Sequence, residues 1–325
     1  MTATPLAWVV GRGGLLGRHV EEAMDVELWR PPGTTPWSDR PAAEAVLQRR
    51  AERFLERAAG SQRPWRLLWC AGAGVVATPP AALAEETALA GAFVARVSEL
   101  LLDGPQLAAR GTIFLASSAG GVYAGSPAPH PFDESSPVRA AAPYGHAKLA
   151  QEELFARAAE ACGVDLVIGR LSNLYGPGQK LSKPQGLIAH VGGSSLRRRP
   201  ISIYVPLDTI RDYLFAADAA RMVALALERR EEARQSGSSR ETIVKIFASE
   251  VDTTVASVLG TWRQVLRRPL RVALAGDPVG KLQPRTLSFR SHVWPELRGQ
   301  PTPLRLGVDA VRRDQLARLL DAGLG

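Results

Sequence analysis

The chain has 325 residues, of which 46% are hydrophobic, and a formal net charge of +8. This length allows one large α/β domain, or a cofactor domain joined to a smaller domain, without any stabilising disulfide. With only two cysteines present, we expect no disulfide framework and a cytoplasmic location. No apolar run approaches the roughly 18 residues of a membrane span. The basic clusters are short and lack interleaved aromatic residues, so we expect no nucleic-acid partner and no membrane partner.

Apolar runs alternate with helical patterns through the first half of the chain. The pattern predicts strands over residues 6–10, 26–29, 66–70, 112–116 and 164–168. It predicts helices over residues 42–58, 80–102 and 143–162. Strands that alternate with helices form parallel sheets with right-handed crossovers. The predicted fold class is therefore α/β, with a Rossmann-type doubly wound parallel sheet.

Beyond residue 172 the pattern becomes less regular. Loops rich in Gly, Pro and Ser separate helical segments near residues 216–230, 254–267 and 311–320. We predict a sheet domain over residues 1–172. Residues 173–325 are expected to form mainly a smaller substrate-binding region, with some segments returning to the sheet domain.

A glycine-rich turn follows the first predicted strand and opens the first helix. Gly11, Gly14 and Gly17 have the spacing GxxGxxG. Glycines at this spacing allow a tight turn, close approach of the backbone to a pyrophosphate, and packing of the helix on the strand. The spacing therefore predicts a dinucleotide site, and the alternative is an ordinary glycine turn. Further contacts to the dinucleotide are expected from the neighbouring residues Arg12, Leu15 and Leu16, and from Ala71 and Gly72 after the third strand.

Arg30 stands at the end of the second predicted strand, where an acidic residue usually binds the adenosine ribose. An arginine cannot accept the ribose hydroxyls but can pair with a 2′-phosphate. NADP(H) is therefore favoured, while NAD(H) stays possible, and Arg12 offers a second positive charge. The alternative is that Arg30 simply points into solvent.

Tyr144 and Lys148 are four residues apart, which places both on one face of a helix. A nearby ammonium stabilises a phenolate, so that a tyrosine can exchange protons near neutral pH. The alternative is an ordinary pair of surface residues. Ser117 and Ser118 end the strand that precedes this helix.

Taken together, these motifs resemble the extended short-chain dehydrogenase/reductase family of NAD-dependent epimerases and dehydratases. The resemblance runs from about residue 6 to residue 222. Further matches are Val122–Tyr123, Asp133–Glu134, residues 143–148, residues 170–179 and residues 211–213.

The resemblance implies that Tyr144 donates or accepts the proton, that Lys148 binds the nicotinamide ribose, and that a serine hydroxyl binds the reacting oxygen. Counting from the strand assigns this role to Ser118, with Ser117 as the second choice. Ser117 is also expected to contact the cofactor. Counting back from Val122 gives Ala119 instead. A nucleotide-diphosphate sugar substrate and a homodimer are also implied. Substrate contacts are expected from Asn173, Gln185, Leu187 and Arg211, the alternative for Arg211 being an ion pair with Asp212.

The dehydratases of this family resemble one another in a Thr-Asp-Glu run before the Val-Tyr pair, where this chain has Ala119, Gly120 and Gly121. Without these acids we do not expect a 4,6-dehydratase, which leaves reduction of a nucleotide-linked ketosugar or epimerisation through a transient ketone. Because Arg30 favours the phosphorylated cofactor, we expect reduction, at C4. The first alternative is a nucleotide-sugar 4-epimerase with tightly bound NAD, and the second is a noncatalytic dinucleotide sensor. The histidines lack metal-ligand spacing, so no metal is expected.

Overall fold

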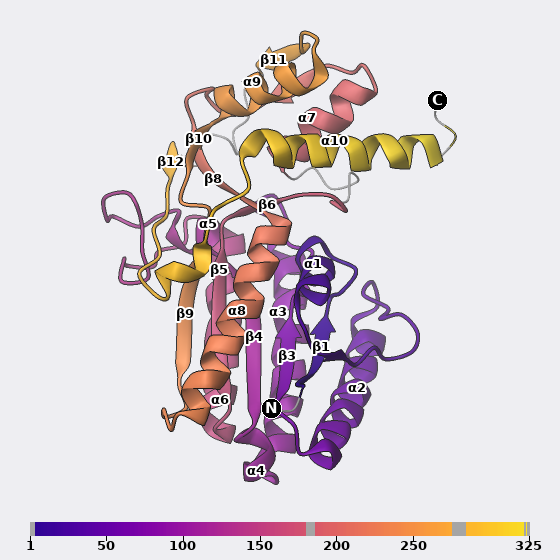
Figure 1. Cartoon of the computed structure of the whole chain (residues 1–325), viewed down its shortest axis with the longest axis vertical. Helices are drawn as coiled ribbons and strands as arrows, with labels where there is room; N and C mark the ends of the chain where they lie inside the picture. The colour runs from indigo at the N-terminus through magenta and orange to yellow at the C-terminus, as the bar shows by residue number, and fades with distance from the viewer. Residues whose placement is uncertain (1–3, 180–185, 275–283, 322, 324–325) are drawn as a thin grey trace.

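A six-stranded parallel sheet forms the centre of the computed structural model, which describes residues 4–179, 186–274, 284–321 and 323 (Figure 1). Its strand order is β2-β1-β3-β4-β5-β9, so the order reverses between β1 and β3. This confirms the predicted α/β fold with a parallel sheet. The strands are β1 (Leu6–Val10), β2 (Glu27–Leu28), β3 (Trp65–Trp69), β4 (Gly111–Ser118), β5 (Asp165–Leu171) and β9 (Thr242–Phe247).

Helices cover both faces of the sheet because successive strand side chains point to opposite faces. Trp8 of β1 packs in one core with Phe54 and Phe93, and the adjacent Val9 packs in another with Val20 and Val223. The first core is formed with α2 (Arg40–Ser61), α3 (Pro80–Leu102) and α6 (Pro143–Cys162). The second is formed with α1 (Leu15–Ala23) and α8 (Ala216–Gln235). Two short helices, α4 (Pro105–Ala108) and α5 (Ala119–Tyr123), flank β4.

A smaller region lies beyond one end of the sheet and carries α7, α9 and α10 (Figure 1). Its own apolar core contains Tyr175 and Trp262, both almost fully buried. The chain returns from this region to the sheet with α8 and β9, and β9 pairs in parallel with β5. The elements of the smaller region are β6 (Asn173–Tyr175), α7 (Leu187–Leu196), β7 (Ile201–Ile203), β8 (Ile210–Phe215), β10 (Asp252–Thr254), α9 (Val255–Leu266), β11 (Val272–Leu274), β12 (Thr286–Leu287) and α10 (Leu304–Asp321). The 3-10 helix η2 (Pro295–Arg298) instead packs on α8, and its Leu297 joins the second core of the sheet.

Helix α10 begins seven residues before its predicted start at residue 311, at Leu304. Gly307 lies within its first turns, where a Cβ atom would be only 2.3 Å from the hydroxyl oxygen of Tyr175. The helix can therefore lie directly on the ring of Tyr175. Within the described ranges, no helix has both the length and the apolar character needed to cross a bilayer.

Lys245 of β9 ties the edge of the sheet to the C-terminal part of the chain. Its side chain is fully buried, and its ammonium donates hydrogen bonds to Ser291 Oγ at 2.9 Å and to the carbonyl of Val293 at 2.5 Å. Glu134 joins the same network by accepting from Ser291 Oγ and from the backbone N–H of Ile246. Burial lowers the pKa of Lys245 from 10.5 to about 8.

This lowered pKa gives the free energy of unfolding a defined pH dependence. Between pH 8 and pH 10.5 the unfolded chain binds the Lys245 proton and the folded chain does not, so stability rises with pH in this window. Chemical denaturation of the wild-type protein and of Lys245→Met should therefore show a stability difference that grows in favour of the wild type across it. Titrations of groups that do not interact with Lys245 cancel in the comparison. A difference that stays constant from about pH 7 to about pH 10 would contradict the lowered pKa.

Candidate active site

The segment that joins β1 to the first turn of α1 accepts only glycine at two positions, Gly11 in the turn and Gly17 in the helix. Gly11 has φ +91°, and a Cβ atom there would lie 2.6 Å from the backbone nitrogen of Ala71. A Cβ atom at Gly17 would lie 2.5 Å from the carbonyl oxygen of Gly11. The first glycine therefore lets the turn pass against the chain after β3, and the third lets α1 pack on the turn.

Helix α1 starts at this turn with no side chain capping its N-terminus. Its N-cap residue is Gly14, and its first turn contains no acidic residue. The backbone N–H groups of a first helical turn have no partner within the helix, and the helix dipole places positive charge there. Leu15 and Leu16 thus present N–H groups that fit a pyrophosphate at the point where the strand order reverses.

Arg30 follows β2 and pairs with an acid of α1. Its Nε donates to Glu21 Oε2 at 3.1 Å, and its side chain is 51% exposed. The guanidinium is thus held beside α1 by one hydrogen bond, with much of its surface open to a ligand. Arg12, in the glycine turn, is exposed.

The turn after β3 approaches Lys148 of α6. A Cβ atom at Gly72, which has φ +156°, would lie 3.5 Å from Lys148 Nζ and 3.1 Å from Glu86 Oε1. Ala71 is buried against Gly11. The predicted contacts Gly11, Ala71, Gly72 and Lys148 therefore form a continuous wall at the carboxyl ends of β1 and β3.

Ser118 and Tyr144 are brought together by two glycines. A Cβ atom at Gly121 would lie 3.1 Å from the Tyr144 ring and 3.3 Å from Ser118 Oγ. A Cβ atom at Gly145 would lie 2.1 Å from the carbonyl oxygen of Gly121. Helices α5 and α6 thus meet backbone to backbone, and the phenol ring lies over Gly121 beside the serine.

The Ser118 hydroxyl oxygen accepts the N–H of Gly121 at 3.1 Å, which caps α5. Because this bond uses a lone pair, the hydroxyl proton can still be donated to a ligand. Lys148 lies on the same helix as Tyr144, with Nζ 5.9 Å from the ring centroid. Its ammonium donates to Gln151 Oε1 at 3.0 Å.

Ser117 points into a different environment. Its hydroxyl donates to Glu152 Oε1 at 2.5 Å, and Glu152 is paired with Arg170 at 2.7 Å. Arg170 also donates to the Tyr123 hydroxyl at 2.6 Å. This buried network ties β4, β5, α5 and α6 together, so the geometry favours Ser118 over Ser117 as the serine that faces a ligand.

The expected substrate contacts lie on the elements that enter the smaller region. Asn173 is exposed and donates to the backbone oxygen of Asp212 at 3.0 Å. Arg211 of β8 is buried and donates to the carbonyl of Ile210 at 2.7 Å. Leu187 is half-buried at the start of α7, and Gln185 lies outside the described residues.

Asp212, beside Arg211, faces Ser172 and Ser249. Its carboxylate accepts both hydroxyls, at 2.5 Å and 2.9 Å. Burial raises the pKa of Asp212, and the hydrogen bonds from the two serines oppose this rise. Asp212 therefore joins β8 to the segments that end β5 and β9.

Three residues of this site escaped the sequence reasoning. Glu86 and Gln151 contact Lys148 from α3 and α6, and Gly145 sets the approach of α5 to α6. Gly145 lies inside the YxxxK motif, so its position beside Tyr144 could have indicated a close helix contact that only glycine allows. Glu86 lies in an ordinary helical pattern, and nothing in that pattern distinguishes it from a surface glutamate.

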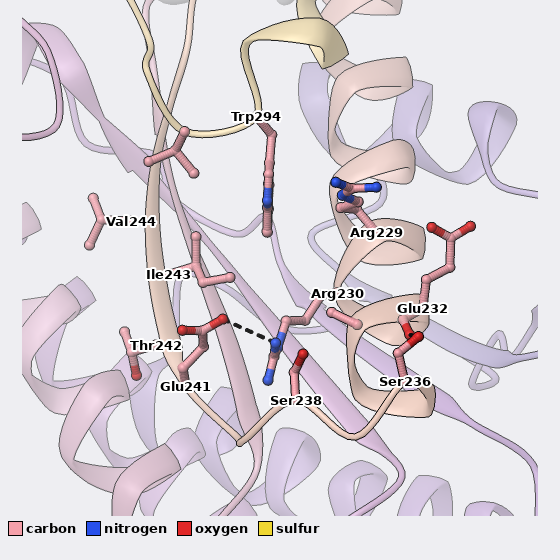
Figure 2. A pocket seen from close by; sticks show the side chains of 12 residues that line it. Arg229, Arg230, Glu232, Ser236, Ser238, Glu241, Thr242, Ile243, Val244 and Trp294 are labelled. Carbon is pink, nitrogen blue, oxygen red and sulfur yellow. Dashed lines mark hydrogen bonds and ion pairs between the residues drawn. The ribbon is translucent and has the colours of Figure 1, made fainter.

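A hollow of about 690 Å³ lies elsewhere, between the second half of α8 and the first residues of β9. Figure 2 shows Trp294 and Arg229 around it, with Arg230 bonded to Glu241. None of the predicted site residues lines this hollow. It is therefore separate from the candidate site at the carboxyl ends of the strands.

Comparison with known proteins gives matches over both sequence and structure. A putative UDP-glucose 4-epimerase of Methanocaldococcus jannaschii is 32% identical over 132 residues, 41% of this chain and 43% of that protein. A dTDP-4-dehydro-6-deoxyglucose reductase of Escherichia coli is 30% identical over 142 residues, 43% of this chain and 44% of that protein. The matches thus span less than half the length of these curated relatives.

Among solved structures, a UDP-glucose 4-epimerase of Thermus thermophilus in complex with NAD has a TM-score of 0.74 at 20% identity. The comparison covers 96% of this chain and 99% of that protein, and it shows a shared fold. A family model, that of the NAD dependent epimerase/dehydratase family, matches residues 7–239, which include the glycine turn, Ser118, Tyr144, Lys148 and Arg211. The chain belongs to the NAD dependent epimerase/dehydratase family.

Proposed function

We propose that the protein is an NADPH-dependent reductase of a nucleotide-linked ketosugar, acting at C4. The observation that carries the proposal is the meeting of Ser118, Tyr144 and Lys148 beside the glycine turn, with no acid on α5. The Tyr144 ring and Ser118 Oγ both lie against Gly121, and Lys148 is on the same face of α6 as Tyr144. These residues can bind an oxygen and exchange a proton with it.

Each side chain has a role that follows from its contacts. The Ser118 hydroxyl keeps its proton and donates a hydrogen bond to the ketone oxygen, while its own oxygen accepts the Gly121 N–H. Tyr144 protonates the same oxygen as negative charge develops on it. Lys148 keeps donors available beyond its bond to Gln151, and these orient the nicotinamide ribose. A bound nicotinamide supplies the hydride.

Two observations favour reduction over other reactions of the family. Helix α5 begins Ala-Gly-Gly and contains no carboxylate, so it lacks acids that could move protons at neighbouring carbons. Arg30 carries an exposed guanidinium beside α1, which suits the 2′-phosphate of NADPH. The relative named as a reductase is consistent with this choice.

The alternative is a 4-epimerase with tightly bound NAD, and the relative named as a putative UDP-glucose 4-epimerase favours it. A nucleotide diphosphate group would meet Arg211 and Asn173 in either case. The homodimer implied by the resemblance and the cytoplasmic location expected from the two cysteines stay predictions. Light scattering of the purified chain tests the first of these.

Cofactor choice is tested at Arg30. Arg30→Ala should weaken NADPH binding by about 1 to 3 kcal/mol, the value of a charge-assisted hydrogen bond, and leave NADH binding unchanged. Glu21→Gln should strengthen the preference for NADPH, since it weakens the bond that holds the guanidinium. Calorimetric titration gives both affinities, with Arg157→Ala at an exposed ion pair as control. Equal wild-type affinities for the two cofactors would refute the assignment.

Proton transfer is tested at Tyr144. Tyr144→Phe should lower turnover by about 10² to 10⁴, because general acid catalysis is lost, while cofactor affinity stays nearly the same. Steady-state kinetics with the cofactor titrated separately measures both quantities. Tyr204→Phe, at an exposed tyrosine, is the matched control. Full turnover in Tyr144→Phe would remove this residue from the reaction.

The fate of the hydride separates reductase from epimerase. A reductase consumes one NADPH per product, so absorbance of NADPH should fall in proportion to the reduced sugar when a nucleotide-linked 4-ketosugar is added. Lys148→Ala should abolish this consumption. Purified protein that instead carries NAD and interconverts two sugar epimers without net redox change would establish the epimerase alternative.

A further inference from the structure

Glu86 of α3 connects two parts of the candidate site. Its Oε2 accepts the backbone N–H of Ala73 at 2.7 Å and that of Gly74 at 2.9 Å. Its Oε1 faces Lys148 Nζ at 3.8 Å. The Glu86 and Lys148 side chains are only 17% and 8% exposed. One carboxylate therefore holds the turn after β3 and places negative charge beside the lysine.

The Glu86–Lys148 distance leaves the donors of the lysine available. At 3.8 Å the two groups form an ion pair without a hydrogen bond, whereas Gln151 Oε1, almost fully buried, accepts one ammonium proton at 3.0 Å. An ammonium has three donors. Two donors are thus left for a ligand, and the ion pair fixes the ammonium without consuming them.

We propose that Glu86 is a positioning residue, which holds the turn at residues 72–74 against the dinucleotide and balances the charge of Lys148. This inference rests on the proposed function, because it assigns Lys148 and Tyr144 their roles there. Gly72 is the contact point, since a Cβ atom at this residue would touch both Glu86 Oε1 and Lys148 Nζ.

Two neighbouring carboxylates on α6 and α3 have arginine partners in the described part of the chain. Glu152, one turn further along α6, is paired with Arg170 from β5. Glu85, next to Glu86 on α3, is exposed and paired with Arg40 from α2. Glu86 is therefore the carboxylate that offsets the ammonium beside Tyr144. Its removal should make Lys148 a stronger stabiliser of the phenolate.

The experiment compares Glu86→Ala, Glu86→Gln and the control Glu85→Gln in the full chain. Glu86→Ala removes both backbone hydrogen bonds, so the NADPH dissociation constant, measured by fluorescence titration, should rise roughly tenfold. The amide oxygen of Glu86→Gln can still accept these N–H groups, so its dissociation constant should stay within about threefold of the wild type. Glu85→Gln should equal the wild type.

The second readout is the tyrosinate absorbance of Tyr144, taken as the difference between each protein and the same protein with Tyr144→Phe. In Glu86→Gln the absorbance should rise at lower pH than in the wild type and in Glu85→Gln, because the ammonium is no longer offset. A purely structural role for Glu86 would not produce this shift, since Glu86→Gln keeps the shape and the backbone hydrogen bonds.

Tyrosinate titration of Glu86→Gln identical to the wild type, or NADPH binding of Glu86→Ala identical to the wild type, would overturn the proposal. Neither measurement needs the sugar substrate. If the wild-type protein binds no NADPH, the proposed function fails. The tyrosinate comparison then still decides whether Glu86 balances the charge of Lys148.

Discussion

The contact between the backbones of Gly121 and Gly145 is the constraint on which the chemistry depends. A Cβ atom at residue 145 would lie 2.1 Å from the Gly121 carbonyl oxygen, so any side chain there would separate α5 from α6. With both glycines in place, the Tyr144 ring lies over Gly121 next to Ser118, and Lys148 follows one turn later. Gly11 imposes a similar constraint at the cofactor end, where it lets the glycine turn pass against Ala71. Glycines thus allow the close backbone contacts that form both the cofactor end and the catalytic end of the site.

The sheet could be predicted where apolar runs end in turn-forming residues. Strand β1 over Leu6–Val10 and helix α3 over Pro80–Leu102 have the predicted bounds, because glycines and prolines mark their ends. Strand β9 was not predicted, since the charged Lys245 interrupts its apolar pattern. The structure explains this lysine by its buried acceptors, Ser291 Oγ and the carbonyl of Val293. The partners that stabilise β9 lie far along the chain, so the local sequence of the strand does not reveal them.

The candidate site divides in the same way. Tyr144, Lys148 and Ser118 follow from motif spacing, because helical and strand periodicity fixes which neighbours share a face. The partners of these residues do not follow from spacing. Ser117 is committed to Glu152, Arg30 to Glu21, and Lys148 to Gln151 and Glu86, and each of these contacts joins different elements or different turns of one helix. The residues that hold and balance the charged groups of the site therefore lie outside the sequence motifs.

The central claim is that a dinucleotide lies between the glycine turn and Lys148, with Tyr144 and Ser118 facing its nicotinamide end. A crystal structure of the protein grown with NADPH tests this most directly. The account predicts the pyrophosphate at the N-terminus of α1, the ribose within hydrogen-bonding reach of Lys148, and the 2′-phosphate beside Arg30. Density for NADPH in the hollow beside Trp294, or anywhere other than the carboxyl ends of β1 and β3, would contradict it.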